Sequence, residues 1–159
     1  MANDVFKIDF PKDLSQVHFI KLFLKNKEGK IISDAFYWRS KDSYDGAWTM
    51  TGPAISGFQK IDQLAQAELD ITIEQEKNSI KVKVRNISNS LSFFTQLKLQ
   101  DQTGKSISPT FYSDNFFNLL PDESKTIVLT LPDEKLPSTP VLLKVEAYNT
   151  VLKTYKIEM

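Results

Sequence analysis

Alternation of apolar and polar residues runs through most of this 159-residue chain and narrows its possible folds more than any other feature. Ile80, Val82 and Val84 alternate with basic residues, and the segments 69–73 and 127–131 repeat the pattern. A spacing of two residues places the apolar side chains on one face of an extended strand. Strands of this kind are typical of antiparallel sheets with one buried and one solvated face. The sequence therefore predicts an all-β protein.

The spacing of these strands predicts an immunoglobulin-like antiparallel β-sandwich over residues 64–159, because seven strands in about 100 residues suit that fold. The expected strands are 67–74, 79–85, 93–100, 106–112, 125–131, 141–148 and 152–158. Residues 1–40 supply a short strand that includes Phe6, Ile8 and Phe10, followed by a hairpin. Three strands bury too little surface to be stable alone. We therefore expect residues 1–40 to be the C-terminal strands of a preceding immunoglobulin-like domain, and residues 41–63 to be an interdomain linker.

Two stretches of the chain share identical residues at several positions with a constant offset. FIKLFLKNKEGKIISDAFYW (19–38) and FTQLKLQDQTGKSISPTFYS (94–113) are each expected to form a β-hairpin. An Asn or Asp that opens the turn and a glycine that closes it (Gly29, Gly104) favour a type I turn followed by a left-handed residue. The similarity fits either a shared hairpin pattern or two related sandwich units. The unequal flanking segments favour tandem sandwiches without a strict repeat.

The composition limits the possible chemistry. Twenty basic residues balance twenty acidic ones, so no strong field favours nucleic acid or an anionic membrane as a partner. The chain has no cysteine and one histidine, His18, which argues against a metal site and against cysteine chemistry. No cofactor is expected. The N-terminus lacks the features of a signal peptide, so the chain is expected to be cytoplasmic or cut from a longer protein.

No catalytic residue is assigned from the sequence. Glycoside hydrolysis needs two carboxyl groups at a defined separation across a sugar-sized pocket. The acidic residues here fall at expected turns, such as Asp101 and Asp122, and on wet strand faces, such as Asp70. His18 is expected to lie at a strand edge. The charge balance, the single histidine and the positions of these acidic residues speak against a self-contained enzyme.

Aromatic residues give the candidate substrate-binding site. Tyr44 and Trp48 lie in a loop rich in glycine, where they can stack on sugars or pin a linker onto a neighbouring domain. Tyr112 is a third candidate platform, and Asp114 and Asn115 beside it are assigned to the same site. The side chains of Asp114 and Asn115 can also bond to nearby backbone, because they enter a turn.

Phe116, Phe117, Leu119 and Leu120 are expected to tuck under the sandwich. The tripeptide Asn86–Ile87–Ser88 matches a glycosylation sequon, which is a short and weakly specific pattern.

The run ISPTFYSDNFFNLLPDESKTIVLTL (107–131), preceded by KVRNISNSLSFFTQLKLQD (83–101), resembles a known domain. This is the C-terminal immunoglobulin-like domain of glycoside hydrolase family 2 enzymes of the β-mannosidase and exo-β-D-glucosaminidase branch. Tyr112 and Tyr148 replace tryptophans of that pattern, and Asp122 replaces its usual glycine. The matching residues are Asn86, Phe93, Phe94, Ser113, Asp114, Asn115, Phe117, Leu119, Leu120, Pro121, Glu123, Ser124 and Asn149.

The first hairpin, GKIISDAFYWRS (29–40), is similar to the end of the preceding sandwich in the same enzymes, with Ala35 in place of an asparagine. The resemblance implies a parent with a (β/α)₈ barrel that carries the catalytic glutamates. Such a barrel takes about 250 residues, so no catalytic residue is transferred to this chain.

The function expected from this resemblance is that of a non-catalytic accessory β-sandwich domain of a β-mannosidase-like hydrolase, which supports the barrel and helps to wall the substrate cleft. The alternatives are an independent carbohydrate-binding module with exposed aromatic residues and a free-standing adhesion domain. The expected partners are the other domains of the parent hydrolase and, secondarily, oligosaccharide. By analogy, the parent is expected to be periplasmic or extracellular.

Overall fold

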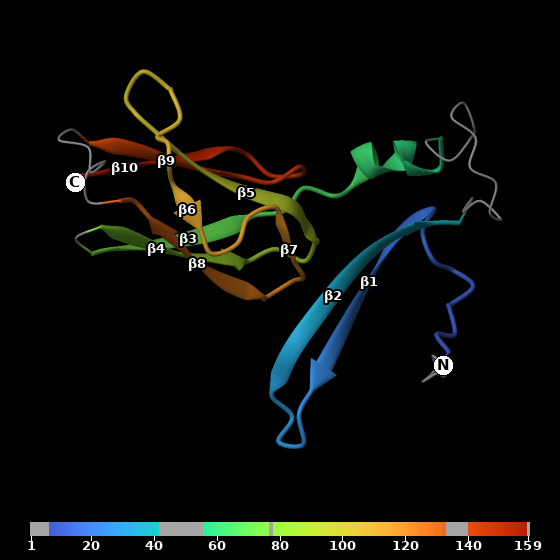
Figure 1. Cartoon of the computed structure of the whole chain (residues 1–159). Coiled ribbons are helices and arrows are strands. Elements are labelled where there is room, and N and C mark those ends of the chain that lie inside the picture. Colours follow the sequence, from blue (N-terminus) through green and yellow to red (C-terminus); the bar gives the residue numbers. More distant parts are fainter. Residues whose placement is uncertain (1–6, 42–55, 77, 133–139, 159) are drawn as a thin grey trace. The chain divides into compact units, whose positions relative to one another are not determined.

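The computed structural model describes residues 7–41, 56–76, 78–132 and 140–158. It divides the chain into two compact units, Met1–Gln63 and Leu64–Met159 (Figure 1). The regular elements of the described residues are antiparallel strands and one short 3₁₀ helix. This confirms the predicted all-β fold. Most of the expected linker 41–63 lies outside the described residues, and its last part forms the 3₁₀ helix.

The first unit contains an antiparallel hairpin and the 3₁₀ helix. Strand β1 (Val17–Lys25) pairs with β2 (Ile31–Ser40), and the helix η1 spans Ser56–Gln63. The Gly29 N–H donates to the Asn26 carbonyl at 3.0 Å, and Gly29 has a φ of +79°. The predicted type I turn with a left-handed closing residue is therefore confirmed.

The expected strand at the start of the first unit is wrong, since residues 7–10 have no strand structure. Phe10 instead packs edge-on against His18, with ring centroids 5.9 Å apart, and lies under Arg39, whose guanidinium carbon is 4.4 Å from the ring centroid. Pro11 follows at once, and a proline has no N–H to extend a ladder. The segment is thus held by side-chain packing onto the hairpin.

The second unit is a sandwich of two four-stranded antiparallel sheets (Figure 1). One sheet has the order β3-β4-β8-β6 and the other has the order β10-β9-β5-β7. The strands are β3 (Leu69–Glu76), β4 (Ser79–Asn86), β5 (Ser92–Gln100), β6 (Phe111–Tyr112), β7 (Phe117–Leu119), β8 (Ser124–Thr130), β9 (Val141–Glu146) and β10 (Lys153–Ile157).

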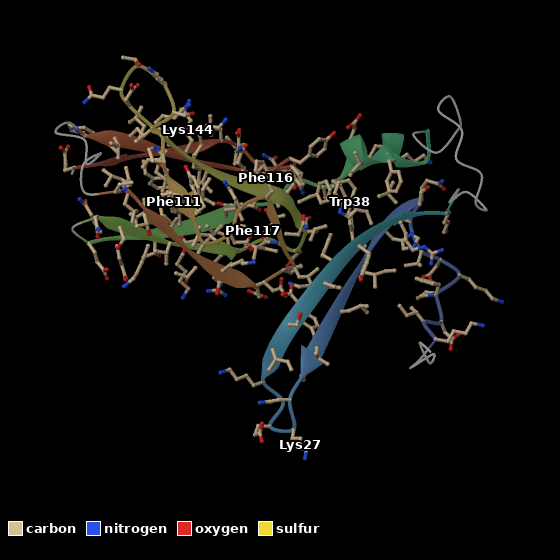
Figure 2. The ribbon with its side chains drawn as sticks, viewed as in Figure 1. Lys27, Trp38, Phe111, Phe116, Phe117 and Lys144 are labelled. Carbon is tan, nitrogen blue, oxygen red and sulfur yellow. The ribbon has the colours of Figure 1, made fainter. Side chains whose placement is uncertain are left out.

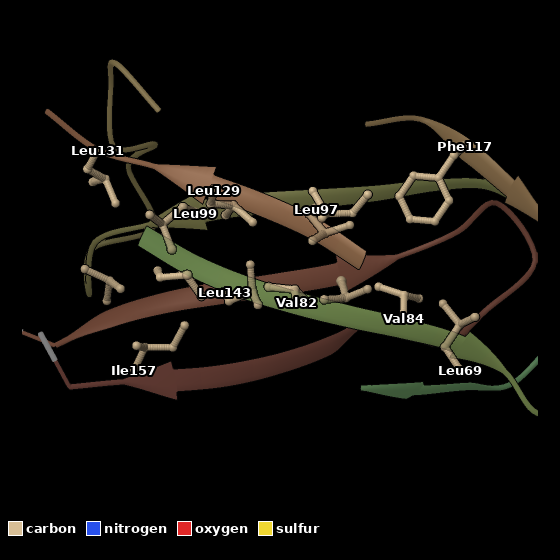
Figure 3. Packing of buried hydrophobic residues seen from close by; sticks show 14 of the residues in the cluster. Leu69, Val82, Val84, Leu97, Leu99, Phe117, Leu129, Leu131, Leu143 and Ile157 are labelled. Carbon is tan, nitrogen blue, oxygen red and sulfur yellow. The ribbon is translucent and has the colours of Figure 1, made fainter. Parts of the chain in front are cut away.

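The core of the second unit lies between its two sheets (Figure 3). Ile80, Val82 and Val84 of β4 are fully buried, as their alternation predicts. They face the buried side chains of Leu97 and Leu99 from the opposite sheet. Inner faces that interdigitate in this way define a β-sandwich.

The second repeated stretch keeps its turn but does not form a hairpin, contrary to the prediction. The Gly104 N–H donates to the Asp101 carbonyl at 3.0 Å, and Gly104 has a φ of +87°. Beyond the turn only an isolated bridge joins Gln100 to Ser106. The expected strand 106–112 is reduced to β6, which pairs with β8 of the other sheet. Pro109 lies within this crossing segment, where it cannot donate to a ladder.

Strand β7 (Phe117–Leu119) was not expected. It pairs with the beginning of β5 and buries Phe117 and Leu119, as predicted for these two side chains. Phe116, which was expected to be buried with them, is 47% exposed. In the part of the chain that the structure describes, no helix has both the length and the apolar character needed to cross a membrane.

Candidate functional site

The predicted site residues fall in two places. Tyr44 and Trp48 lie outside the described residues. Tyr112, Asp114 and Asn115 lie in the second unit, at the end of β6 and in the connection from β6 to β7. The structure therefore brings three of the five together, beside the strand β5.

Asn115 pairs with the backbone of Leu97 in the manner of a neighbouring strand. Its Oδ1 accepts from the Leu97 N–H at 2.9 Å, and its Nδ2 donates to the Leu97 carbonyl at 3.0 Å. The opposite edge of β5 is already paired with β9 at this position. The carboxamide thus satisfies two backbone groups that no strand reaches.

Tyr112 bonds to the same edge of β5, two residues further along the strand. Its hydroxyl oxygen accepts from the Leu99 N–H at 3.0 Å. Burial raises the pKa of Tyr112, and the hydrogen bond from Leu99 lowers it by less. The phenol is consequently neutral at ordinary pH, and its oxygen is committed to the sheet.

Asp114 is held by its own turn and by one lysine. Its Oδ1 accepts from the Asn115 N–H at 2.7 Å, and its Oδ2 forms an ion pair with Lys125. The Lys125 ammonium nitrogen also lies 5.3 Å from the centroid of the Phe117 ring. The polar groups of Tyr112, Asp114 and Asn115 are therefore used by the sandwich itself, and a contact with sugar stays a prediction.

Other asparagines of the sequence motif act in the same way. The fully buried Asn86 donates from Nδ2 to the carbonyls of Ser90 and Leu119, at 2.7 and 3.0 Å. The Asn149 Nδ2 donates to the carbonyls of Ala65 and Leu91, both at 2.7 Å. Each of these side chains ties together segments that are distant in sequence.

An exposed aromatic cluster, which sequence reasoning missed, lies where β5 pairs with β7. The rings of Phe94 and Phe116 are 5.2 Å apart, and they are 42% and 47% exposed (Figure 2 labels Phe116). The buried Phe93 contacts both Phe94 and the exposed Tyr148, at 5.9 and 6.0 Å. The adjacent pair Phe93–Phe94 was the available signal, since in an alternating strand one of two neighbouring residues faces outward.

A cavity of 360 Å³ opens between the ends of the two sheets of the second unit. Lys153 lines it, but its ammonium group donates to the Leu69 carbonyl at 2.6 Å. The cavity is lined by Gln66, Ala67, Glu68, Leu69, Ser88, Thr150, Val151 and Lys153. Glu68 is its one carboxylate, so the lining does not supply the two carboxyl groups that glycoside hydrolysis needs.

The carboxyl groups with shifted pKa values lie at exposed positions. Hydrogen bonds from Lys81 lower the pKa of Glu76, and those from Thr103 lower the pKa of Asp101. Within the described ranges, no three metal-ligating side chains gather into a cluster. The two carboxyl groups with lowered pKa values therefore stabilise a strand end and a turn.

The chain matches one protein-family model, described as the exo-β-D-glucosaminidase Ig-fold domain, over residues 48–150. It is similar to the exo-β-D-glucosaminidase of Arthroderma benhamiae, with 31% identity over 96% of this chain and 18% of that protein. It is also similar to the exo-β-D-glucosaminidase of Streptomyces avermitilis, with 28% identity over 89% of this chain and 17% of that protein. The chain thus spans less than a fifth of the length of these curated relatives.

The fold is also that of a solved structure. The crystal structure of the Amycolatopsis orientalis exo-chitosanase CsxA aligns with 94% of this chain and 19% of that protein, with a TM-score of 0.71 and 19% sequence identity. At this level of identity the likeness concerns the fold alone.

Proposed function

This chain belongs to the family of exo-β-D-glucosaminidase Ig-fold domains, and from that premise we propose that it is a non-catalytic accessory region of a larger family 2 glycoside hydrolase. In this role the sandwich braces the catalytic domain of the same polypeptide and helps to form one wall of its substrate cleft. Residues 1–40 are proposed to be the last strands of a preceding sandwich. The site bears on this role as well as the family, because fold alone does not determine function.

This role is supported by the hydrogen bonds that the motif's polar side chains form with backbone groups of the sandwich. Asn86, Asn115 and Asn149 satisfy backbone groups of the chain itself. A catalytic constellation would instead direct its polar groups toward a space that a substrate can enter. The residues that mark the family therefore act in building the sandwich.

The relatives favour a β-D-glucosaminide over a β-D-mannoside as the substrate of the proposed parent, since both curated relatives above are named exo-β-D-glucosaminidases. Specificity is proposed to reside in the catalytic domain. The parent is further proposed to work in the periplasm or outside the cell. Fractionation of the source cells followed by immunoblotting tests that location.

The test compares the polypeptide that the complete gene encodes with the 159-residue chain alone. Both are assayed on aryl β-D-glucosaminides and aryl β-D-mannosides. We expect hydrolysis of the glucosaminide by the complete polypeptide and none by the chain alone. A gene that encodes no further domain, or activity in the chain alone, would overturn the proposal.

The exposed aromatic cluster keeps a second candidate open, an independent carbohydrate-binding module. Its test is isothermal titration calorimetry of glucosamine oligosaccharides against the 159-residue chain. We expect no measurable binding. Saturable heat that disappears in a Tyr148→Ala variant would favour the module instead.

A further inference from the structure

The exposed apolar side chains of the second unit are concentrated at one end of the sandwich. This end is formed by the β4–β5 connection, the residue before β7 and the β9–β10 connection. Its exposed large apolar residues are Ile87, Phe94, Phe116, Tyr148, Val151 and Leu152, which we call the apolar end. Elsewhere in the described part of the second unit, Phe111 is the one residue of this kind. It pairs with Thr130 of β8, which pairs in turn with Ser79 at the start of β4, far from the apolar end.

The backbone is distorted at the two phenylalanines of the apolar end. Phe94 and Phe116 have φ values of 58° and 60°, in the left-handed region that residues with a side chain rarely adopt. The pairing of β5 with β7 shifts register between Ser92 and Thr95, which marks a bulge at Phe93–Phe94. Across this bulge Phe93 and Thr95 stay buried and Phe94 stays exposed, and bulges of this kind are recurrent local features rather than defects.

Hydrogen bonds hold this distorted geometry in place. The Phe94 N–H donates to Asn118 Oδ1 at 2.8 Å, and the Phe116 N–H donates to Asn115 Oδ1 at 3.1 Å. Beneath them, the fully buried hydroxyls of Ser92 and Thr95 bond to each other at 2.9 Å. Unfavourable backbone angles persist only where the surroundings enforce them, and they mark functional positions more often than chance. The surrounding hydrogen bonds thus hold the two rings in their exposed positions.

The shape of the cluster suits a protein surface better than a sugar ring. The Phe94 and Phe116 planes are tilted by 43°, and the Phe93 and Tyr148 planes by 78°. A pyranose stacks on a flat, open aromatic face, whereas the rings of this cluster are inclined to one another and form an uneven apolar surface. Phenylalanine also lacks a polar edge to bond a sugar hydroxyl. Exposed apolar patches of this kind mark contacts with other protein surfaces.

We propose that the apolar end is the surface through which the sandwich docks onto a further domain of the same polypeptide, against an apolar face of that domain. This inference rests on the proposed function. A further domain is the partner that the relatives offer, because the chain spans only 18% and 17% of the two relatives named above. A domain linked in this way is held at a high effective concentration, so a modest apolar surface suffices for stable docking.

Hydrogen exchange measured by mass spectrometry tests this docking. The complete polypeptide and the 159-residue chain are compared at peptides that cover 87–94 and 147–152. We expect exchange at these peptides to be slower in the complete polypeptide by about tenfold or more. A Tyr148→Lys/Val151→Lys variant of the complete polypeptide is expected to lose that protection, and a Phe111→Lys variant is expected to keep it.

The two lysine positions are exposed and neither has a positive φ, so the variant is expected to fold, which circular dichroism of the 159-residue chain verifies. Equal exchange in both forms, or equal effects of the two variants, would overturn the docking surface while leaving the proposed function intact. A gene that encodes no further domain would overturn both. Protection that appears in the isolated chain only on addition of glucosamine oligosaccharide would assign the apolar end to sugar and overturn the docking surface.

Discussion

The carboxamide of Asn115 and the backbone of Leu97 form a reciprocal pair of hydrogen bonds, at 2.9 and 3.0 Å. Through this pair a side chain substitutes for a strand at the edge of β5. The same oxygen also accepts from the Phe116 N–H at 3.1 Å. One side chain therefore fixes both the edge of β5 at Leu97 and the start of the next backbone segment at Phe116.

Asn115→Ala is expected to lower the free energy of unfolding of the second unit by about 2 kcal/mol, because it leaves the N–H and carbonyl of Leu97 without partners. Urea titration of this transition measures the loss. The exposed Asn89 provides a matched control, and Asn89→Ala is expected to change stability by less than about 0.5 kcal/mol. Asn115→Asp can accept but cannot donate, so a fully stable Asp variant would contradict the pairing.

Tyr112→Phe is expected to lower stability by about 1 kcal/mol at neutral pH, since the Leu99 N–H loses its acceptor. The dependence on pH gives a second measure. Burial raises the pKa of Tyr112 in the folded state, so the unfolded state releases its proton first, near pH 10. The stability that the neutral phenol contributes is complete below that pH, and it is lost as pH rises through the folded pKa.

The slope of stability against pH above about 10 should therefore be shallower in Tyr112→Phe than in the original chain. Tyr155, whose pKa is also raised by burial, contributes in the same direction, and Tyr155→Phe is the comparison. Denaturant titrations at a series of alkaline pH values give the slopes. Identical slopes in the original chain and in Tyr112→Phe would show that the phenol is not buried in solution.

Gly104→Ala is expected to cost about 1 kcal/mol, and the cause should be the backbone alone. Gly104 has a φ of +87°, and a Cβ added there meets no atom within 4 Å. Gly29 has the same open surroundings and a φ of +79°, so Gly29→Ala should weaken the first unit by a similar amount. Thermal unfolding of both variants compares them. A Gly104→Ala variant with unchanged stability would mean that the turn does not need a left-handed residue.

Asn86 is expected to remain unglycosylated in the folded protein despite its sequon. Its Nδ2, the atom that would carry the glycan, is buried and donates to two carbonyls. Expression in a host that glycosylates secreted proteins, followed by intact-mass measurement, should give the unmodified mass. Asn86→Ala should lower stability by roughly 3 kcal/mol, because several buried groups lose partners at once. A soluble, folded glycoform would contradict this placement.

The strands of the second unit were predictable because burial and alternation are local properties of sequence. Ile127, Leu129 and Leu131 follow the period of two, and all three are fully buried. The glycine turns were predictable for a similar reason, since the left-handed residue is fixed within four positions. The strand expected at 106–112 did not form as predicted, because residues 111–112 pair with β8 of the other sheet and Pro109 cannot donate to a ladder.

The candidate site was only partly predictable. The motif that contains Asp114 and Asn115 marked the right segment, but the sequence could not distinguish a side chain aimed at a ligand from one aimed at a distant backbone. That difference depends on which edge of β5 lies open after folding. The outward direction of Phe94 follows from alternation beside the buried Phe93, but the left-handed backbone at Phe94 and Phe116 could not be predicted from the sequence.

By itself the sequence determined the fold class, the burial of the strand faces and the turn geometry, since each depends on residues within a few positions of one another. The tertiary structure alone decided that the segment after the second turn joins the other sheet. It also decided which backbone groups the motif's asparagines bind. Those outcomes depend on pairings between segments that lie far apart in the chain, such as the 18 positions between Leu97 and Asn115. A local pattern of residues contains no record of such pairings.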